Sequence, residues 1–437
     1  MLEVHRTHRA KIRNRSQVED SLNRHGWSAS KLWNVANYHS REVWEETGEI
    51  PDHEELKDEL KTHPKYKGLH SQSSQRVLEE LAEAFNSWYS SDDDSDNPPG
   101  YRKENYYDDE GRRVHEEHPR STVTWKQNGI RHDTKNNRVR LSKGANHKEH
   151  PRAWEYILVE YETRPGVGVE NLQQVRAVYD HAKERWELHL VCKDEIETPN
   201  APGNETAGID LGISNFAAVA YSTEDADLYP GNRLKQDGYY FPKEIAKYDD
   251  SSGERATRLH HKWSERRTHF FHSLGKHIVE KCVERGVGRI NVGNLEGVRE
   301  NEKGNSKNWG KHGNLALHGW AFDRFTSILE YKAKVEGIEV VEVDESDTSM
   351  TCCICGRGED SQRVERGLYV CEDCDAAFNV DVNGAENIRL DITESNSESA
   401  PDLGGDRSTG WLAQPAVHLY DLSCGVQPQR EVVDCKP

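Results

Sequence analysis

Residues 348–390 read TSMTCCICGRGEDSQRVERGLYVCEDCDAAFNVDVNGAENIRL, and this stretch determines how the rest of the chain is interpreted. It contains two Cys-x-x-Cys pairs with 15 residues between them, formed by Cys352, Cys355, Cys371 and Cys374. Each pair can turn two sulfurs toward one centre, and four thiolates suit the tetrahedral coordination that zinc prefers. The spacing therefore predicts a structural zinc ribbon over residues 348–377.

Disulfide bonds and a redox pair are the other interpretations of these cysteines. The chain starts MLEVHRTHRAK, which is polar and basic and lacks the apolar core of a signal peptide, so we expect a cytoplasmic protein. A reducing cytoplasm favours metal binding over disulfides. Cys353 is a further thiol inside the first pair, and Cys352 is chosen as the ligand because it gives the two-residue spacing to Cys355.

Length and charge limit the classes of protein that the chain can represent. Its 437 residues are enough for about three domains. No run approaches the roughly 18 apolar residues of a membrane span, so no membrane partner is expected. The net charge is −19, whereas nucleic-acid-binding proteins normally carry a basic excess. However, the acidic runs fall in apparent linkers at 92–96 and 108–110, and the acidic, methionine-poor composition is typical of a halophile.

Three regions are predicted before residue 201. Residues 1–16 form the first strand, or basic arm, of a small β-barrel. Residues 17–97 form a helical domain, in which we expect Gly26 to divide the first helical stretch in two. Residues 98–200 supply the rest of the barrel, because segments such as RVRLSKG and WEYILVEYET alternate between apolar and polar residues.

A mixed α/β pattern follows over residues 201–347 and resumes after the ribbon over residues 378–395. The order is strand, hairpin, helix, strand, helix, strand and a final helix, which is the order of a mixed-sheet α/β nuclease. The stretch DITESNSESAPDLGGDRSTG, residues 391–410, is polar and rich in turn-forming residues, and we predict that residues 396–437 are largely disordered.

Asp210 is the first candidate catalytic residue. Alternation along a predicted strand places Ile209 and Leu211 on one face and Asp210 on the other, between Gly208 and Gly212. The two glycines are expected to leave open space around the carboxylate, as a metal-bound phosphodiester would need.

Further acids are expected near Asp210 in the folded chain. Asp381 opens the final helix, where Asn383 is expected to cap the helix or to orient the carboxylate. Another acid is expected just after the strand at 289–293. Carboxylates at the ends of neighbouring strands can hold two magnesium ions, which demand hard oxygen ligands. Magnesium is therefore the predicted catalytic cofactor, beside structural zinc.

Nine basic residues are candidate nucleic-acid contacts. Five lie in the N-terminal segment, and four lie along a long basic helix predicted over residues 254–285. They are Arg6, Arg9, Lys11, Arg13, Arg15, Arg258, Lys262, Arg266 and Arg267.

Four motifs together resemble the TnpB (OrfB) proteins of insertion sequences, which are relatives of type V CRISPR effectors. They are GIDLG, the VGNLEG segment, the TS-x-TC-x-x-CG ribbon and D-x-N-G-A-x-N-I. The resemblance covers roughly residues 1–395 and is densest over 206–390. It implies a RuvC/RNase H-like nuclease domain with an inserted zinc ribbon, a helical recognition domain and a barrel-like wedge domain.

The resemblance also implies partners and an activity. It implies a guide RNA transcribed from the end of the element, cleavage of target DNA beside a short motif, and a role in maintaining the transposon. A companion transposase of the same element is a further implied partner. In such systems base pairing reads the sequence, and the protein reads shape and the short motif.

One position departs from the family pattern. Family members commonly place the second catalytic Glu where the second nuclease strand ends, and here that position is Gly293, followed by Asn294. Glu296 is favoured as the replacement because it is nearest the strand end. Glu300 is the next alternative, since it lies on the same face if the segment is helical. The remaining alternative is that the second site is lost.

The predicted function is an RNA-guided, magnesium-dependent DNA endonuclease in which Asp210, Glu296 and Asp381 hold the ions. Two alternatives stay open. A cleavage-dead, guided DNA-binding repressor is favoured by the departure at Gly293, and a guide-free, resolvase-like nuclease would need no RNA.

Overall fold

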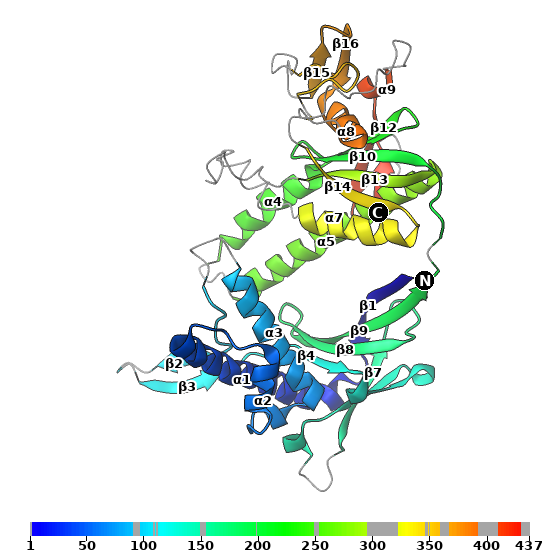
Figure 1. Cartoon of the computed structure of the whole chain (residues 1–437). Helices are drawn as coiled ribbons and strands as arrows, with labels where there is room; N and C mark the ends of the chain where they lie inside the picture. The colour runs from blue at the N-terminus through cyan, green and yellow to red at the C-terminus, as the bar shows by residue number, and fades with distance from the viewer. Residues whose placement is uncertain are drawn as a thin grey trace. The chain divides into compact units, whose positions relative to one another are not determined.

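The computed structural model describes residues 2–90, 97–107, 110, 112–148, 154–197, 199–248, 253–294, 322–345, 348, 350–358, 367–391 and 410–429 (Figure 1). The chain divides into two compact units, Met1–Ile196 and Glu197–Pro437, and each has its own sheet and its own core. The prediction of a multidomain α/β chain is therefore confirmed. Within the described residues, no helix is long and apolar enough to cross a membrane.

The first unit is built on a seven-stranded antiparallel sheet with the order β4-β8-β9-β1-β7-β6-β5. Its strands are β1 (Leu2–Ile12), β4 (Val123–Lys126), β5 (Ile130–Asp133), β6 (Arg138–Ser142), β7 (Tyr156–Glu162), β8 (Leu172–Asp180) and β9 (Arg185–Ile196). The strands predicted from alternation are confirmed, and the basic N-terminal strand lies in the middle of the sheet. A separate hairpin pairs β2 (Glu104–Tyr107) with β3 (Arg113–Glu117).

The two edge strands of this sheet, β4 and β5, are consecutive in the chain. Only the 3₁₀ turn Gln127–Gly129 joins them, and three residues span at most about 10 Å. The sheet must therefore curl until these two strands approach each other at the turn. No ladder pairs β4 with β5 in the part of the chain that the structure describes, so a closed barrel stays a prediction.

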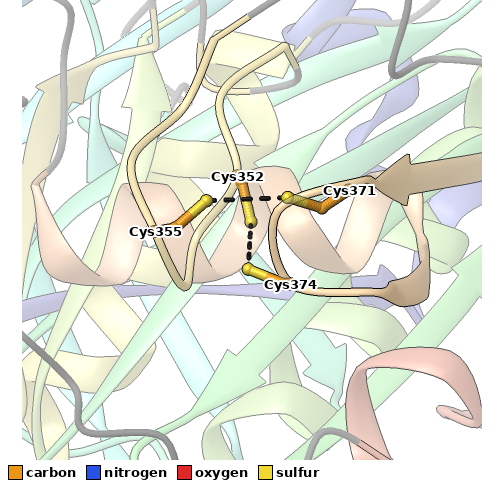
Figure 2. A group of neighbouring side chains, drawn as sticks. All are labelled: Cys352, Cys355, Cys371 and Cys374. Atoms are coloured by element: carbon orange, nitrogen blue, oxygen red, sulfur yellow. Dashed lines mark hydrogen bonds between the residues drawn. The ribbon is translucent and has the colours of Figure 1, made fainter.

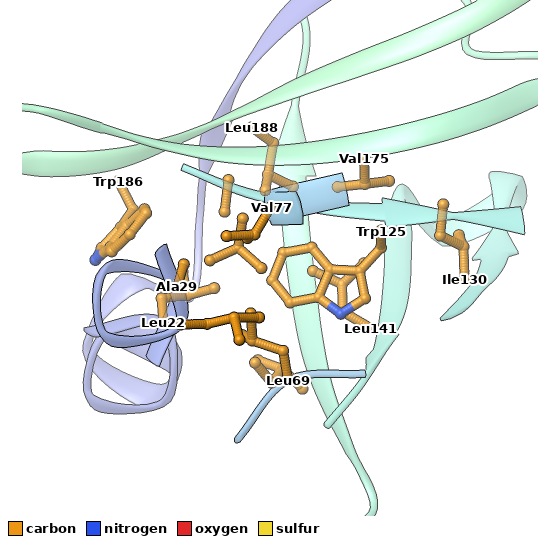
Figure 3. Packing of buried hydrophobic residues seen from close by; sticks show 14 of the residues in the cluster. Leu22, Ala29, Leu69, Val77, Trp125, Ile130, Leu141, Val175, Trp186 and Leu188 are labelled. Atoms are coloured by element: carbon orange, nitrogen blue, oxygen red, sulfur yellow. The ribbon is translucent and has the colours of Figure 1, made fainter. Parts of the chain in front are cut away.

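Three helices are inserted between β1 and β2: α1 (Arg15–Thr47), α2 (His53–Leu60) and α3 (Ser71–Tyr89). Apolar side chains of α1 and α3 pack with those of the sheet in one core, where the fully buried Trp125 lies among Leu22, Val77, Leu141 and Val175 (Figure 3). Apolar residues at helical spacing bury one face of α3, whereas Tyr89 at its end is exposed; the buried residues are Val77, Leu78, Leu81, Ala82 and Phe85.

Gly26 does not divide the first helix. α1 runs through it without interruption, and a Cβ at this position would lie 2.8 Å from Cη2 of Trp186. The glycine therefore lets the indole of β9 approach the helix backbone. The expectation of two helices was wrong because the tertiary contact outweighs the modest helix penalty of about 1 kcal/mol for glycine.

The second unit contains a mixed seven-stranded sheet with the order β14-β13-β10-β11-β12-β17-β18. Its strands are β10 (Glu205–Leu211), β11 (Asn215–Tyr221), β12 (Asp225–Pro230), β13 (Val287–Asn294), β14 (Glu339–Asp344), β17 (Ala416–Asp421) and β18 (Gly425–Pro428). β10, β13 and β14 are parallel, whereas β11 is antiparallel to both of its neighbours. The carboxyl ends of β10, β13 and β14 therefore meet at one edge of the sheet.

Helices cover both faces of this sheet. Among the described residues, the helices of the unit are α4 (Asn232–Ile245), α5 (Glu254–Glu284), α7 (Phe322–Val335), α8 (Val380–Leu390) and α9 (Gly410–Ala413). Residues of α5 and α7 share a core with Ile209 and Leu211 of β10, and residues of α8 share another core with Ala218 of β11. Ile209 and Leu211 thus face away from α8, as alternation predicts, and the other face of β10 meets α8.

The ribbon is a two-stranded element in the second unit. β15 (Leu368–Cys371) pairs with β16 (Ala376–Asn379), and α8 begins at the next residue, Val380. Asp381 therefore lies in the first turn of the helix that leaves the ribbon directly.

The prediction of disorder over residues 396–437 is wrong for residues 410–429. These residues form α9, β17 and β18, and β17 pairs in parallel with β12. A buried hydrogen bond helps to hold the segment: Nε2 of His418 lies 2.8 Å from Oδ1 of Asp227, whose Oδ2 accepts a hydrogen bond from the Tyr221 hydroxyl at 3.0 Å. The segment is short, and it follows a polar, turn-rich stretch, so tertiary contacts of this kind are needed to give it a defined structure.

Candidate functional site

The four predicted cysteines come together at one point of the ribbon (Figure 2). The sulfur of Cys352 lies 3.8 Å from that of Cys374, and the sulfur of Cys355 lies 3.5 Å from that of Cys371. All four sulfurs lie within 4.8 Å of one another. A tetrahedral ion with zinc–sulfur bonds of about 2.3 Å requires sulfur–sulfur separations of about 3.8 Å. The cluster therefore has the size and the donor set of a four-thiolate zinc site.

The fifth cysteine of the ribbon, Cys353, does not belong to this cluster. Its thiol is buried, and burial raises its pKa well above the usual value. Its backbone N–H donates a hydrogen bond to the side chain of Asn383 in α8 at 3.0 Å. This geometry agrees with the choice of Cys352 from spacing. Burial also raises the pKa of Cys352 to about 12, and a bound dication would favour the thiolate form there.

Two asparagines of α8 attach the first cysteine pair to the helix. Asn383 Nδ2 donates to the carbonyl of Thr351 at 2.8 Å, and Asn387 Nδ2 donates to the carbonyls of Thr348 and Thr351, each at 2.7 Å. Asn383 and Asn387 lie on one face of the helix because they are four residues apart. Asn383 therefore positions the ribbon, and it neither caps the helix nor contacts the Asp381 carboxylate as the sequence suggested.

Asp381 is oriented by residues that the sequence did not single out. Asn379 is the N-cap of α8, and its side-chain oxygen accepts the backbone N–H groups of Asp381 and Val382. Nδ2 of Asn215, at the start of β11, donates to Oδ2 of Asp381 at 2.7 Å. No local pattern points to Asn215, because 166 residues separate it from its partner.

Asp210 lies against the same helix. A Cβ at Gly384 would lie 2.8 Å from Oδ2 of Asp210, so the glycine lets this carboxylate approach the backbone of α8. Gly384 is three residues after Asp381, which places it one turn along the helix on a neighbouring face. β10 and the first turns of α8 thus bring the two predicted acids to one region, at the carboxyl end of β10.

Gly208 has a different role from the predicted one. A Cβ at this position would lie only 2.1 Å from the carbonyl oxygen of Ala385 and 2.5 Å from the backbone nitrogen of Arg389. The glycine therefore permits close packing of α8 on β10, and it does not leave open space beside Asp210.

A buried ion pair fastens the end of α8 to β10. Both carboxylate oxygens of Glu386 accept hydrogen bonds from Arg389, each at 2.6 Å, and the arginine also donates to the hydroxyl of Thr206 at 3.0 Å. Glu386 is only 1% exposed. Burial acts to lower the pKa of Arg389, but its hydrogen bonds to Glu386 raise this pKa above the usual value, so the guanidinium keeps its charge and holds the helix beside the strand.

The predicted second catalytic acid cannot be placed. Glu296 and Glu300 lie outside the described residues, which stop at Asn294 and resume at Phe322. The strand that precedes them is described: β13 ends at Gly293 and Asn294, as predicted.

The five N-terminal basic candidates lie on β1 or just after it, and all are exposed: Arg6, Arg9, Lys11, Arg13 and Arg15. Arg6 and Arg15 make ion pairs within the first unit. Arg6 lies 3.3 Å from Asp194 of β9, and Arg15 lies 3.1 Å from Glu19. Arg9 and Lys11 point to the same face of β1 because they are two residues apart, opposite the buried Ala10.

The four candidates on α5 differ in their exposure. Arg258 and Lys262 are exposed, whereas Arg266 and Arg267 are half-buried. The guanidinium of Arg266 lies 2.7 Å from the carboxylate of Asp237 in α4, so this arginine joins the two helices.

Comparisons with known proteins agree with the motifs. A model of a probable transposase family (OrfB_IS605) matches residues 189–299, and a model of the Cas12f1-like TNB domain matches residues 322–388. The TnpB-like protein ORF457 of Acidianus two-tailed virus is 26% identical over 416 residues, which cover 85% of this chain and 83% of that protein. The resemblance to TnpB (OrfB)-type proteins is therefore confirmed.

Two further relatives match about half of this chain. The CRISPR-associated endodeoxyribonuclease Cas12f1 of Sulfoacidibacillus thermotolerans is 24% identical over 49% of this chain and 52% of its own length. The putative RNA-guided DNA endonuclease InsQ of Escherichia coli K12 is 23% identical over 47% of this chain and 53% of its own length. The chain is thus homologous to TnpB-like and Cas12f proteins, and the matches to Cas12f1 and InsQ span only about half of those two proteins.

Solved structures of Cas12 effectors show a weaker likeness. A complex of Cas12f1 with sgRNA and target DNA aligns with a TM-score of 0.35 and 17% identity, covering 89% of this chain and 99% of that one. The mini-RNA-guided endonuclease Cas_phi3 aligns with a TM-score of 0.44 and 10% identity, covering 89% and 92% of the two chains. TM-scores this low do not by themselves establish a common fold.

Proposed function

We propose that this chain is an RNA-guided DNA endonuclease of the TnpB type, with a RuvC/RNase H-like nuclease domain in its second unit. The observation that carries the proposal is the position of Asp210. Its carboxylate lies against Gly384, one turn after Asp381 on the same helix, although 171 residues separate the two acids in the chain. Two carboxylates from a central strand and a neighbouring helix are the arrangement that metal-dependent phosphodiester cleavage needs.

Asp210 and Asp381 would hold catalytic magnesium. Their donors are hard carboxylate oxygens, which fit magnesium better than a softer metal. When bound, the ions would supply an activated water and stabilise the leaving oxygen. The partly positive N-terminus of α8 lies beside Asp381, and the Asn215 amide holds one of its oxygens at 2.7 Å. These contacts fix the direction of the carboxylate before any ion or substrate binds.

The cysteine cluster would hold structural zinc. Its four sulfurs leave no room for an additional ligand in a tetrahedral site, which is the character of a structural centre. Through Asn383 and Asn387 the first cysteine pair is attached to α8. Zinc would therefore stabilise the helix that carries Asp381.

Guide RNA and target DNA are the proposed partners. The printed names of the relatives include RNA-guided and endodeoxyribonuclease activities. On this chain, the exposed Arg9, Lys11 and Arg13 near one another along β1 are suited to phosphate contacts, as are Arg258 and Lys262 on α5. The net charge of −19 means that binding must use such local basic segments, since the chain as a whole repels nucleic acid.

The test uses the full chain purified with the RNA that accompanies it. Sequencing this RNA should reveal one defined species, and magnesium should be required for cleavage of a DNA target that matches it. Asp210→Ala and Asp381→Ala should each abolish cleavage while leaving the amount of bound RNA unchanged. Retained cleavage in either variant would refute the site, and a heterogeneous RNA population would point to a guide-free nuclease.

A guided but cleavage-dead DNA-binding protein is the second candidate. Gly293 favours it, because the resemblance places a catalytic Glu at this position. A wild-type complex that binds its matched DNA tightly but yields no nicked product with magnesium would establish this candidate.

A further inference from the structure

The strand ends around Gly293 place a different acid beside the proposed site. β13 and β14 are parallel, and Gly293 pairs with Val343. On the other side of β13, Val292 pairs with Ile209, so the next residues along these parallel strands are Gly293 and Asp210. Glu345 is the first residue after β14, and its carboxylate lies on the face of Gly293, because a Cβ on Gly293 would lie 2.6 Å from its Oε2. Asp210, Gly293 and Glu345 thus share the face that α8 covers.

The carboxylate of Glu345 occupies the space that a side chain at position 293 would need. A Cβ on Gly293 would lie 2.6 Å from Oε2 of Glu345, 3.2 Å from Cβ of Glu345 and 2.8 Å from Cδ1 of Ile388. Real Cβ atoms essentially never come within 3.0 Å of another atom, so the 2.6 and 2.8 Å contacts would force a shift. A larger residue at 293 and the present position of Glu345 therefore exclude each other.

We propose that Glu345 is the second metal-binding carboxylate of the nuclease site, supplied by β14 in place of the Glu that the family pattern puts on β13. This inference rests on the proposed function. It assigns to Glu345, the first residue after β14, the role that sequence spacing gives to Glu296.

The reach of Glu345 suits this role. Neighbouring strands lie about 4.8 Å apart, so an oxygen above Gly293 is about one strand spacing from the side chain of Asp210. Two magnesium ions about 4 Å apart, each about 2.1 Å from its ligands, need carboxylates separated by distances of this order. In the described residues only the four cysteines form a metal-ligating group within 4.8 Å, so the acids would have to draw closer when cations bind.

The backbone at Glu345 is held by the same helix that carries Asp381. Its carbonyl oxygen accepts the backbone N–H of Thr348 at 3.2 Å and the Thr348 hydroxyl at 2.9 Å. The carbonyl of Thr348 in turn accepts from Asn387 of α8 at 2.7 Å. This chain of hydrogen bonds gives the end of β14 a defined position relative to α8, as a metal ligand requires.

The experiment measures Mn²⁺ binding and DNA cleavage in the same preparations of the full chain with its RNA. Free Mn²⁺ is followed by electron paramagnetic resonance. Glu345→Gln should weaken Mn²⁺ binding by about 10–100-fold or more and lower cleavage at least as much, because even the partners of metal ligands have effects of this size. Glu342→Gln is the matched control, since Glu342 is exposed on β14, three residues before Glu345. It should bind and cleave like the wild type. Glu296→Gln is measured in parallel, because it tests the alternative assignment.

The outcomes separate this inference from the proposed function. If Glu345→Gln binds Mn²⁺ and cleaves DNA like the wild type, or if only Glu296→Gln is impaired, the inference is overturned and the nuclease stands. If Mn²⁺ binding is lost in both Asp210→Ala and Glu345→Gln but the wild type cuts no DNA, the inference stands and the proposed cleavage is refuted. If the wild type shows no Mn²⁺ binding that depends on Asp210, the inference and the proposed function are both refuted.

Zinc content and bound RNA report whether each variant is folded. If Glu345→Gln fails this check, Glu345→Asp takes its place. It keeps the charge but withdraws the carboxylate by one methylene, so the same loss of Mn²⁺ affinity is expected. Wild-type affinity in that variant would overturn the assignment.

Discussion

Replacing Gly384 with alanine should separate catalysis from stability. The new Cβ would lie 2.8 Å from Oδ2 of Asp210, whereas ordinary contacts begin at 3.4 Å, so the carboxylate must move by about 0.6 Å. Displacements of this order in a catalytic group cost roughly 10–100-fold in rate, or about 1.4–2.7 kcal/mol of transition-state stabilisation. The helix itself should gain up to about 1 kcal/mol, because alanine is a better helix former than glycine.

The assay compares single-turnover cleavage of matched DNA with urea unfolding of the same variant. Gly238→Ala in α4 is the matched control, because a Cβ there has no heavy atom within 4 Å and the position is also helical. It should gain similar helix stability without loss of rate. If Gly384→Ala cleaves DNA at the wild-type rate, the active enzyme does not hold Asp210 against α8. If the variant instead loses much of its stability, the backbone of α8 moves, and not the Asp210 carboxylate as assumed here.

Three further outcomes are expected. Gly208→Ala should destabilise the second unit by about 3 kcal/mol or more in urea unfolding, because the new Cβ would lie 2.1 and 2.5 Å from backbone atoms of Ala385 and Arg389. An unchanged free energy of unfolding would contradict the close packing of β10 on α8. Arg389→Met should lower the free energy of unfolding by about 3–5 kcal/mol, because the buried Glu386 loses its ion pair with Arg389. Adding Glu386→Leu should restore most of this stability. If the double variant is no more stable than Arg389→Met, the buried charge is not the cause of the loss. Burial lowers the pKa of His25 to about 4 from 6.5, so the unfolded chain binds an extra proton between these values and stability falls as the pH drops through that window. His25→Asn should remove about 3 kcal/mol of this pH dependence, and equal slopes for variant and wild type would argue against a buried neutral imidazole.

Much of the second unit was predictable because its signals are local. The spacing of Cys352 and Cys355 identifies a metal ligand pair without any knowledge of the fold. Alternation placed Ile209 and Asp210 on opposite faces of β10, and this needs only the two-residue period of a strand. The terminal position of Gly293 on β13 followed in the same way.

Other features depend on contacts between distant segments, and local patterns misjudged them. β17 pairs with β12 through two residue pairs, and the buried contact of His418 with Asp227 supports it. The polar stretch that precedes it along the chain had indicated disorder for the whole C-terminal segment. Gly26 was read as a helix breaker, although the indole of Trp186 requires a glycine there.

The amino-acid sequence by itself determined the zinc-ligand spacing, the faces of the nuclease strands and the family resemblance, because each follows from residue identity at short separations along the chain. Only the tertiary structure decided that Asn215 orients Asp381, that Gly384 admits Asp210 to the helix, and that the carboxylate of Glu345 fills the space above Gly293. Strand register and helix packing bring these atoms together across many tens of residues, and no local period encodes a contact of that kind.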